Sequence, residues 1–179
     1  MSERFFTADW HLFHKNIDSY CNRGQGSIKQ MHETLVKNHN AVVSPEDEVW
    51  ILGDVTLMSP EYAGRVGKLI ERFNGTKHLV LGNHDEWKPH TYEAHGFWTV
   101  HTAMWFPYKD FTIYLAHDPA KYTIINNDPK AVMLCGHIHE LFKHLLPTRR
   151  IINVGVDAWG LCPVSFKQII ELLAEHDIL

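Results

Sequence analysis

The chain has 179 residues, of which 45% are hydrophobic and 21% are charged, and its formal net charge is -4. This composition is ordinary for one soluble globular domain and argues against disordered, collagen-like or membrane-spanning classes. The negative net charge gives no overall positive field that would attract a nucleic-acid backbone, so an anionic substrate would need local cations.

The cysteine and histidine content bears on the cellular compartment and on metal binding. Three cysteines without short paired spacing argue against a disulfide framework and against a structural zinc knuckle. The stretch "MSERFFTADWH" has no long apolar core behind a basic segment, and no apolar run is long enough to cross a membrane, so we expect a cytoplasmic protein. Its fourteen histidines are unusually many, and histidine is the commonest metal ligand.

In chain order, short apolar runs alternate with segments of helical periodicity. Six runs predict buried strands: residues 4–8, 48–53, 78–82, 111–116, 131–136 and 150–155. Helices are predicted at 28–43, 60–73 and 164–176, and the aromatic-rich segment 95–108 can hold two short strands. The pattern predicts an α/β (α+β) fold, a single layered domain over residues 1–179 in which sheets are flanked by helices.

Five of the predicted strands end in a similar way. The stretches "FFTADWH", "WILGDVT", "LVLGNHD", "IYLAHDP" and "MLCGHIH" each finish in a small residue followed by Asp, Asn or His. Because ligands of open α/β sheets bind outside the carboxyl ends of strands, these ends are expected to converge on one crevice. The candidate residues are Asp9, His11, Asp54, Asn83, His84, His117, His137 and His139.

The spacing and chemistry of these candidates favour a metal site. Asp9 with His11, and His137 with His139, are i,i+2 pairs, which project to one side if the backbone is extended. Carboxylates, imidazoles and an amide without thiolates suit Mn²⁺, Fe or Zn²⁺ rather than Ca²⁺. Seven ligands exceed the need of one ion, so two metals sharing a bridging carboxylate are expected, as in two-metal phosphoester hydrolysis.

The ordered blocks "DWH", "GD", "GNHD", a histidine at a strand end and "GHIH" resemble the calcineurin-like metallophosphoesterase superfamily. They span residues 9 to 139, and "YCNR" and "NVGVDAW" further resemble a compact branch of phage and bacterial phosphoesterases. The resemblance implies a four-layer αββα sandwich. It also implies two divalent metal ions, with Mn²⁺ favoured and Fe, Zn²⁺ or Ni²⁺ as alternatives.

The resemblance also implies a role for each candidate. Asp9, His11 and His139 would hold one metal, Asn83, His117 and His137 the other, and Asp54 would bridge them. His84 would protonate the leaving oxygen or stabilise transition-state charge, and a metal-bound hydroxide would be the nucleophile. The expected activity is hydrolysis of phosphodiesters or small phosphoesters.

Other functions stay open at this point. A nuclease or a cyclic-nucleotide phosphodiesterase is the first alternative, although the chain is too short for a further domain that would track long nucleic acid. A metal-binding interaction domain without catalysis is the second. A protein phosphatase is disfavoured because the sequence reads "GDVTLM" where that subtype has "GDxxDRG". We expect a small phosphoester or nucleotide-like substrate and no membrane partner; the oligomeric state is not predicted.

Several polar residues near the blocks have competing interpretations. His14, Asn16 and Arg23 lie in the loop "HKNIDSYCNRGQG" and are candidate substrate contacts, although for any one of them a solvated loop is the simpler explanation. The sequence does not decide whether Asp85 orients a neighbouring residue, or whether Glu86 has a role at the site or merely faces water. Asp157 and Trp159 either wall the site or form a structural turn with a packed indole.

Overall fold

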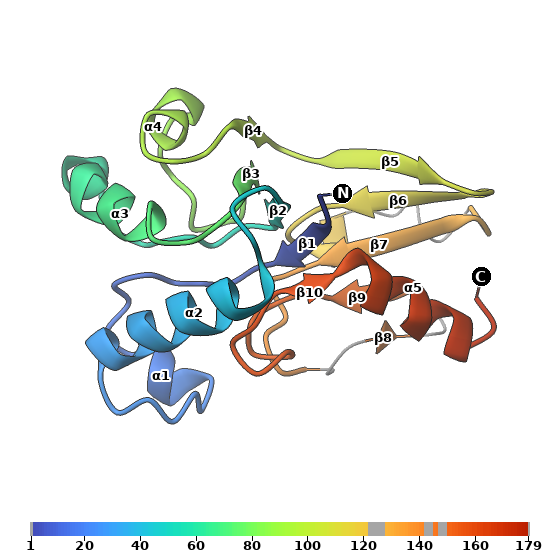
Figure 1. Cartoon of the computed structure of the whole chain (residues 1–179), viewed down its shortest axis with the longest axis horizontal. Coiled ribbons are helices and arrows are strands. Elements are labelled where there is room, and N and C mark those ends of the chain that lie inside the picture. Colours follow the sequence, from blue (N-terminus) through green and yellow to red (C-terminus); the bar gives the residue numbers. More distant parts are fainter. Residues whose placement is uncertain (1, 122–127, 142–144, 147–149, 179) are drawn as a thin grey trace.

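The structure is a computed structural model that describes residues 2–121, 128–141, 145–146 and 150–178. It contains two five-stranded sheets, with strand orders β10-β1-β2-β3-β4 and β5-β6-β7-β9-β8 (Figure 1). The first sheet consists of β1 (Arg4–Thr7), β2 (Glu48–Ile51), β3 (Thr76–Val80), β4 (Thr99–His101) and β10 (Val164–Ser165). The second consists of β5 (Met104–Tyr108), β6 (Phe111–Leu115), β7 (Ala131–Cys135), β8 (Leu145–Leu146) and β9 (Ile151–Asn153).

Five α-helices are described around the sheets. They are α1 (Ile17–Tyr20), α2 (Ile28–Val42), α3 (Ala63–Ile70), α4 (Pro89–Glu93) and α5 (Phe166–Glu175). The side chain of Ser27 caps the start of α2, and a full capping box of Ser165 and Gln168 starts α5. Two 3₁₀ turns, η1 (Pro60–Tyr62) and η2 (Pro119–Lys121), complete the described elements.

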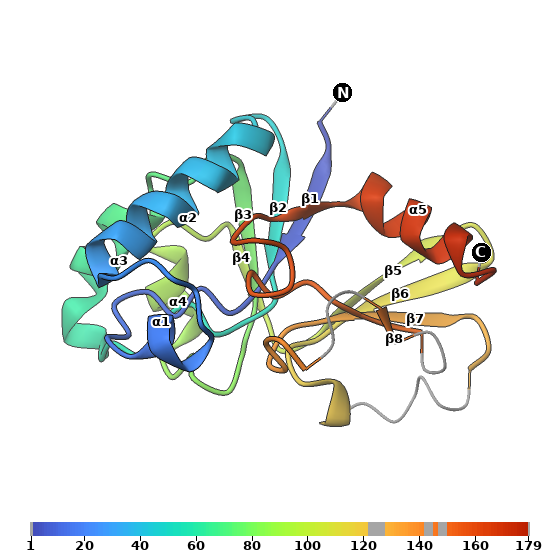
Figure 2. The same cartoon turned by 90° about the horizontal axis from the view of Figure 1, so that it is seen from below.

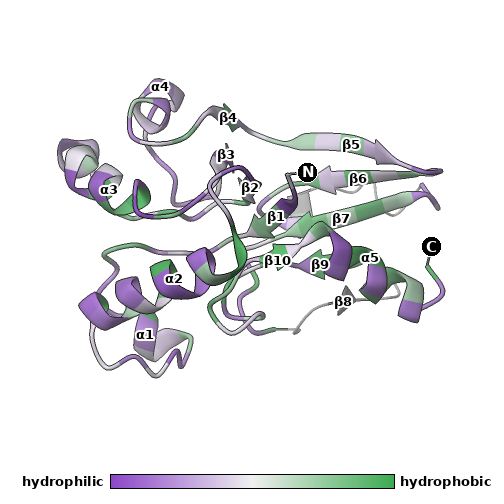
Figure 3. Cartoon of the chain, viewed as in Figure 1, coloured by the Kyte–Doolittle hydropathy of each residue, from purple (hydrophilic) through white to green (hydrophobic). Residues whose placement is uncertain are grey.

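The outer face of the first sheet is covered by helices. Val49, Ile51 and Leu79 are fully buried on that face and belong to one apolar cluster with Met31 and Leu35 of α2. Helices α3 and α4 contribute to the same cluster, while the exposed sides of α2 and α3 are hydrophilic (Figure 3). Because side chains alternate along a strand, the neighbouring residues of each strand point to the opposite face.

The inner faces of the two sheets share a second core. Phe6 of β1 is buried against the cluster that contains Ile113 of β6 and Leu134 of β7. The apolar stripe of α5, with Ile169 and Leu173 at 0% exposure, belongs to this cluster as well. Helix α5 therefore flanks the sheets by packing against this shared core. The described residues of the outer-face cluster of the second sheet come from strands and loops.

The expected α/β sandwich of two sheets flanked by helices is confirmed. All six predicted strands and all three predicted helices are present, and segment 95–108 contains β4 and β5. The sequence did not predict α1, α4, β8 or β10. These elements have two to five residues, too few to show a periodicity.

The strand directions bring the ends of both sheets together. Strands β1, β2 and β3 are parallel, and so are β6, β7 and β9. An isolated parallel bridge between Ala8 and Gly155 connects the end of β1 to the end of β9. Figure 2 shows β1 and β7 converging on the centre of the molecule. Carboxyl ends from both sheets therefore meet in one place.

Candidate metal centre

The residues predicted from the strand ends lie together where the two sheets meet. The first sheet supplies Asp9 and His11 after β1, Asp54 after β2, and Asn83 and His84 after β3. The second sheet supplies His117 after β6, and His137 and His139 after β7. The structure therefore places all eight predicted residues at one site.

The backbone of the site differs from the extended conformation expected for the i,i+2 pairs. Five candidates have positive φ angles: Asp9 (59°), His11 (49°), Asp54 (55°), His137 (72°) and His139 (44°). The expectation of extended pairs was therefore wrong, and left-handed turns direct these side chains to the site instead. Positive φ is uncommon for residues with a side chain and concentrates at functional sites.

Two glycines allow the turns to approach one another. A Cβ atom on Gly136 would lie 2.5 Å from Ala8 Cβ and 2.9 Å from Asp9 Oδ2, and one on Gly82 would collide with the Asp54 carboxylate. Close packing around the Asp9 and Asp54 carboxylates therefore requires a glycine at these two positions.

The first group of donors consists of Asp9, His11 and His139, whose ligand atoms lie within 4.8 Å of one another. Asp9 is fully buried, and its carboxylate accepts the His137 backbone N–H at 3.0 and 3.1 Å. Burial raises the pKa of Asp9 to about 6, against the opposing influence of His117 and His139. This carboxylate is therefore incompletely compensated and would be stabilised by a cation.

His11 gives the clearest sign that a ligand belongs here. Both of its ring nitrogens are buried, and neither has a hydrogen-bond partner among the described residues. Burial lowers the pKa of His11 to about 3, so the ring is neutral near pH 7 and one nitrogen presents a lone pair. A buried imidazole without a hydrogen bond is costly unless another species occupies its lone pair.

The second group of donors consists of Asp54, His117 and His137, again with ligand atoms within 4.8 Å of one another. His117 Nδ1 lies 2.7 Å from the Leu52 carbonyl oxygen and must donate to it, so Nε2 faces the site. That nitrogen lies 3.0 Å from Asn83 Oδ1 and 3.3 Å from Asp54 Oδ2. Three acceptor atoms this close need a proton or a metal cation between them.

Asp54 lies between the two groups. Its Oδ2 atom is 3.6 Å from His11 Nε2 and 3.3 Å from His117 Nε2, so one oxygen faces a histidine of each group. Burial alone would raise the pKa of Asp54, but the hydrogen bond and charge of His117, the His84 N–H and the charge of His11 lower it to about 2. Asp54 is therefore ionised near neutral pH.

These donors fit a divalent cation of the Mn²⁺, Fe or Zn²⁺ type. Buried carboxylates, imidazoles and an amide oxygen converge there, and a third group of donors (Cys21, His139 and Glu140) shares His139 with the first. Cys135, in contrast, is buried in β7 and belongs to the outer-face cluster, as expected for a core residue.

Arg23 and Asp157 form a buried ion pair behind the first group. Arg23 Nε and Asp157 Oδ1 are 2.7 Å apart, and the two side chains are 1% and 2% exposed. The remaining guanidinium donors contact Asp157 Oδ2, the Asp9 and Trp10 carbonyl oxygens and Met31 Sδ. All five donors are thus engaged, which contradicts the prediction that Arg23 contacts the substrate; it positions the loop that carries Asp9.

Asp157 also sets the orientation of His139. Its Oδ2 atom is 2.7 Å from His139 Nδ1, which therefore carries the proton and leaves Nε2 toward the site. This hydrogen bond, together with Cys21 Sγ at 3.3 Å, raises the pKa of His139 to about 10. The sequence left Asp157 open between wall and structural turn; its partners lie 18 and 134 residues away along the chain.

Asp85 holds the two turns that carry Asp54 and Asn83. Its Oδ2 atom accepts the N–H groups of Asp54 and Gly82, both at 2.8 Å, and its Oδ1 atom accepts the Val55 N–H at 2.9 Å. Asp85 therefore orients its neighbours, which was one of the two alternatives, whereas Glu86 is exposed. Trp159 donates its indole N–H to the Asn153 carbonyl oxygen at 2.7 Å, as a packed indole would.

A cavity of about 530 Å³ opens onto both donor groups. His84 lines it with a side chain that is 45% exposed, its Nε2 atom 4.0 Å from Asp54 Oδ2 and its backbone N–H bonded to Asp54 Oδ1. His14 lines the same cavity, whereas Asn16 is exposed, precedes α1 and donates its side-chain amide to the Tyr20 hydroxyl at 3.4 Å. His14 and Asn16 stay predictions as substrate contacts.

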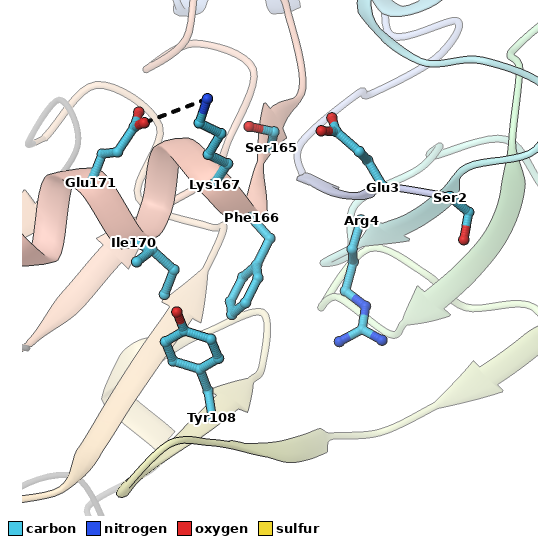
Figure 4. A pocket seen from close by; sticks show the side chains of 9 residues that line it. All are labelled: Ser2, Glu3, Arg4, Tyr108, Ser165, Phe166, Lys167, Ile170 and Glu171. Atoms are coloured by element: carbon cyan, nitrogen blue, oxygen red, sulfur yellow. Dashed lines mark ion pairs between the residues drawn. The ribbon is translucent and has the colours of Figure 1, made fainter.

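A second cavity of about 590 Å³ lies at the other end of β1 (Figure 4). It is lined by Ser2, Glu3, Arg4, Tyr108, Ser165, Phe166, Lys167, Ile170 and Glu171. None of the eight predicted site residues reaches it. Volume alone would favour this cavity, but the groups able to do hydrolytic chemistry line the other one.

Comparison with known proteins agrees with this site. Residues 5–118 match the calcineurin-like phosphoesterase family. The chain belongs to the calcineurin-like phosphoesterases. The superfamily expected from the ordered blocks is thereby confirmed, and with it a phosphoesterase of the hydrolase class.

Two relatives come from an archaeon and a phage, and a solved structure from a bacterium shares the fold. An uncharacterized protein of Methanocaldococcus jannaschii is 30% identical over all of this chain and 96% of its own length. The Gene 66 protein of Mycobacterium phage L5 is 32% identical over 97% of this chain and 95% of its own length. A protein of unknown function from Aquifex aeolicus shares the fold, with a TM-score of 0.74 and 22% identity over 96% of this chain and all of its own.

Among the described residues, no helix has the length and apolar character needed to cross a bilayer.

Proposed function

We propose that this chain hydrolyses phosphodiesters or small phosphoesters with two divalent metal ions, Mn²⁺ being the favoured metal. The observation that supports this most strongly is the position of Asp54, whose Oδ2 atom faces one histidine of each donor group. One carboxylate shared by two groups of donors is the arrangement that a two-metal centre requires.

Asp9, His11 and His139 would hold one ion, Asn83, His117 and His137 the second, and Asp54 both. When bound, such ions supply Lewis acidity and lower the pKa of water that attacks phosphorus. The protein orients the ligands through three backbone contacts of Asp85 and through the bond between Asp157 and His139.

His84 is proposed as the residue that handles the leaving group. It lines the cavity, is solvent-accessible, and has no place in either donor group. Its backbone N–H bond to Asp54 Oδ1 fixes the turn that presents the ring. From there, the imidazole donates a proton to the departing oxygen or stabilises its charge.

Hydrolysis of an aryl phosphodiester with Mn²⁺ tests the proposal. Replacing His84 by Ala is expected to lower kcat by about 100-fold or more, since general acid–base residues contribute about 10² to 10⁴. Replacing Asp54 by Asn, which weakens the ligand shared by both ions, is expected to lower kcat at least as much. Lys130→Gln, an exposed change in the turn before β7, serves as the matched control. Full activity of both site variants would refute the assignment, and inactivity of the wild type with every metal would favour a non-catalytic metal-binding domain.

A further inference from the structure

A third cavity, a groove of about 290 Å³, lies between α2 and α3. We name it the basic groove; it is lined by Phe13, Lys29, His32, Glu33, Arg65, Lys68, Leu69 and Arg72. Four of these residues are cations and one is a carboxylate, a local net charge of +3 in a chain whose net charge is -4. The local cations that an anionic substrate needs are therefore concentrated here.

Most of this positive charge is uncompensated. Arg72 pairs with Glu33 through two hydrogen bonds of 2.9 and 2.6 Å. Among the described residues, the groove contains no other ion pair. The side chains of Lys29, Arg65 and Lys68 are exposed. These three cationic groups lie on neighbouring helices, and Arg65 is also in contact with the Phe13 ring. An anion that binds among them gains from all three charges.

The floor of the basic groove is apolar and aromatic. Phe13 is half-buried, with the Arg65 guanidinium 4.6 Å above its ring centroid and the His32 ring in edge contact at 4.6 Å. The Phe13 N–H donates to His32 Nε2 at 3.0 Å, which fixes the ring in the groove. A cationic rim over an aromatic floor is the combination that binds single-stranded nucleic acid without sequence preference.

The basic groove and the metal centre share one loop. His11 and His14 line the cavity at the metal centre, whereas Phe13, between them in the chain, lines the basic groove. A chain molecule that lies in the groove is therefore bound beside the loop that supplies two residues of the catalytic cavity. The cations of the groove would thus bind the anionic substrate in place of Arg23, whose charge is buried and paired with Asp157.

The spacing of the cations favours a polymer over a single phosphate. The uncompensated cations lie on both walls of the groove, with Lys29 on α2 and Arg65 and Lys68 on α3. Cations on both walls can contact successive phosphates of one strand. Accepting the proposed phosphoesterase activity, on which this inference rests, we propose that the substrate is a single-stranded nucleic acid whose backbone binds the basic groove beside the cleaved bond.

Binding can be measured separately from turnover. The probe is a fluorescently labelled, phosphorothioate-linked oligothymidine of about twenty nucleotides, followed by anisotropy with the full chain. The groove variant Arg65→Gln/Lys68→Gln is compared with Lys130→Gln/Lys167→Gln, which removes the same charge from exposed positions elsewhere. We expect about tenfold or greater weakening in the groove variant and a salt-dependence slope smaller by about 1.4, with little change in the control.

Three results would overturn the inference. The first is equal weakening of both double variants, which would assign binding to overall charge. The second is displacement of the probe by thymidine monophosphate or by polyglutamate as readily as by unlabelled oligothymidine. The third is failure of the wild type to bind. None of these results depends on hydrolysis, so failure of the proposed activity with the aryl phosphodiester remains a separate outcome.

Discussion

The two larger cavities lie at opposite ends of β1 and handle charge in different ways. At the metal centre, carboxylates and histidines are buried, five backbones have positive φ, and His11 has no hydrogen-bond partner among the described residues. At the cavity near the amino end of β1, the charges lie in exposed pairs such as Arg4–Glu48, at 37% and 42% exposure. The buried charges at the metal centre are therefore unfavourable without a cation, and a bound cation would stabilise them. The exposed ion pairs at the amino end of β1 carry little such cost.

The largest expected difference between the two ends is the loss of protein stability when an ion pair is broken. Asp157→Asn leaves the buried Arg23 without its counter-ion, which is expected to lower the free energy of unfolding by about 3–5 kcal/mol. Glu48→Gln breaks an exposed pair and should cost less than about 1 kcal/mol. Urea unfolding of both variants measures the difference, and equal costs would refute the contrast between the ends.

The next largest loss of stability is expected when the hydrogen bonds that hold the turns are removed. Asp85→Asn turns an amide toward N–H groups that the carboxylate now accepts, and is expected to cost about 2–3 kcal/mol. Ser165→Ala, at the helix cap near the other cavity, should cost about 1 kcal/mol. Only the Asp85 variant should also lose affinity for Mn²⁺; unchanged metal affinity would show that Asp85 does not position Asp54.

A smaller effect than loss of the buried ion pair is expected in acid. His39 is buried under Trp10, and burial, with a smaller effect of Lys77, lowers its pKa to about 4. Below its ordinary pKa of 6.5 the unfolded chain binds a proton there that the folded chain does not, so stability falls from about pH 6.5 to about pH 4.

A variant isolates this contribution. His39→Gln keeps a donor for the Asn74 carbonyl oxygen but does not titrate, so it should lose about 2 kcal/mol less than the wild type across that range. Thermal unfolding of metal-free protein at several pH values measures this. Parallel pH profiles of the two proteins would exclude His39 as the cause.

The contrast between the ends also explains what could be predicted from the sequence. All five residues of β7 are buried, and such strands could be recognised from their apolar runs. The polar residue after each run then indicated the site. The roles of Asp85, Asp157 and Arg23 were not readable, because their partners are set by contacts up to 134 residues apart. The positive φ angles were not predicted either, because the i,i+2 spacing was interpreted as extended backbone.

The most direct test of the central claim is the number of Mn²⁺ ions bound per chain, measured by equilibrium dialysis with metal analysis. We predict about two ions for the wild type and about one each for His11→Ala and His137→Ala, because each variant disrupts one donor group. Asp54→Ala, which removes the shared carboxylate, should weaken both ions. Binding of one ion or none by the wild type, or an unchanged number in both histidine variants, would contradict the account.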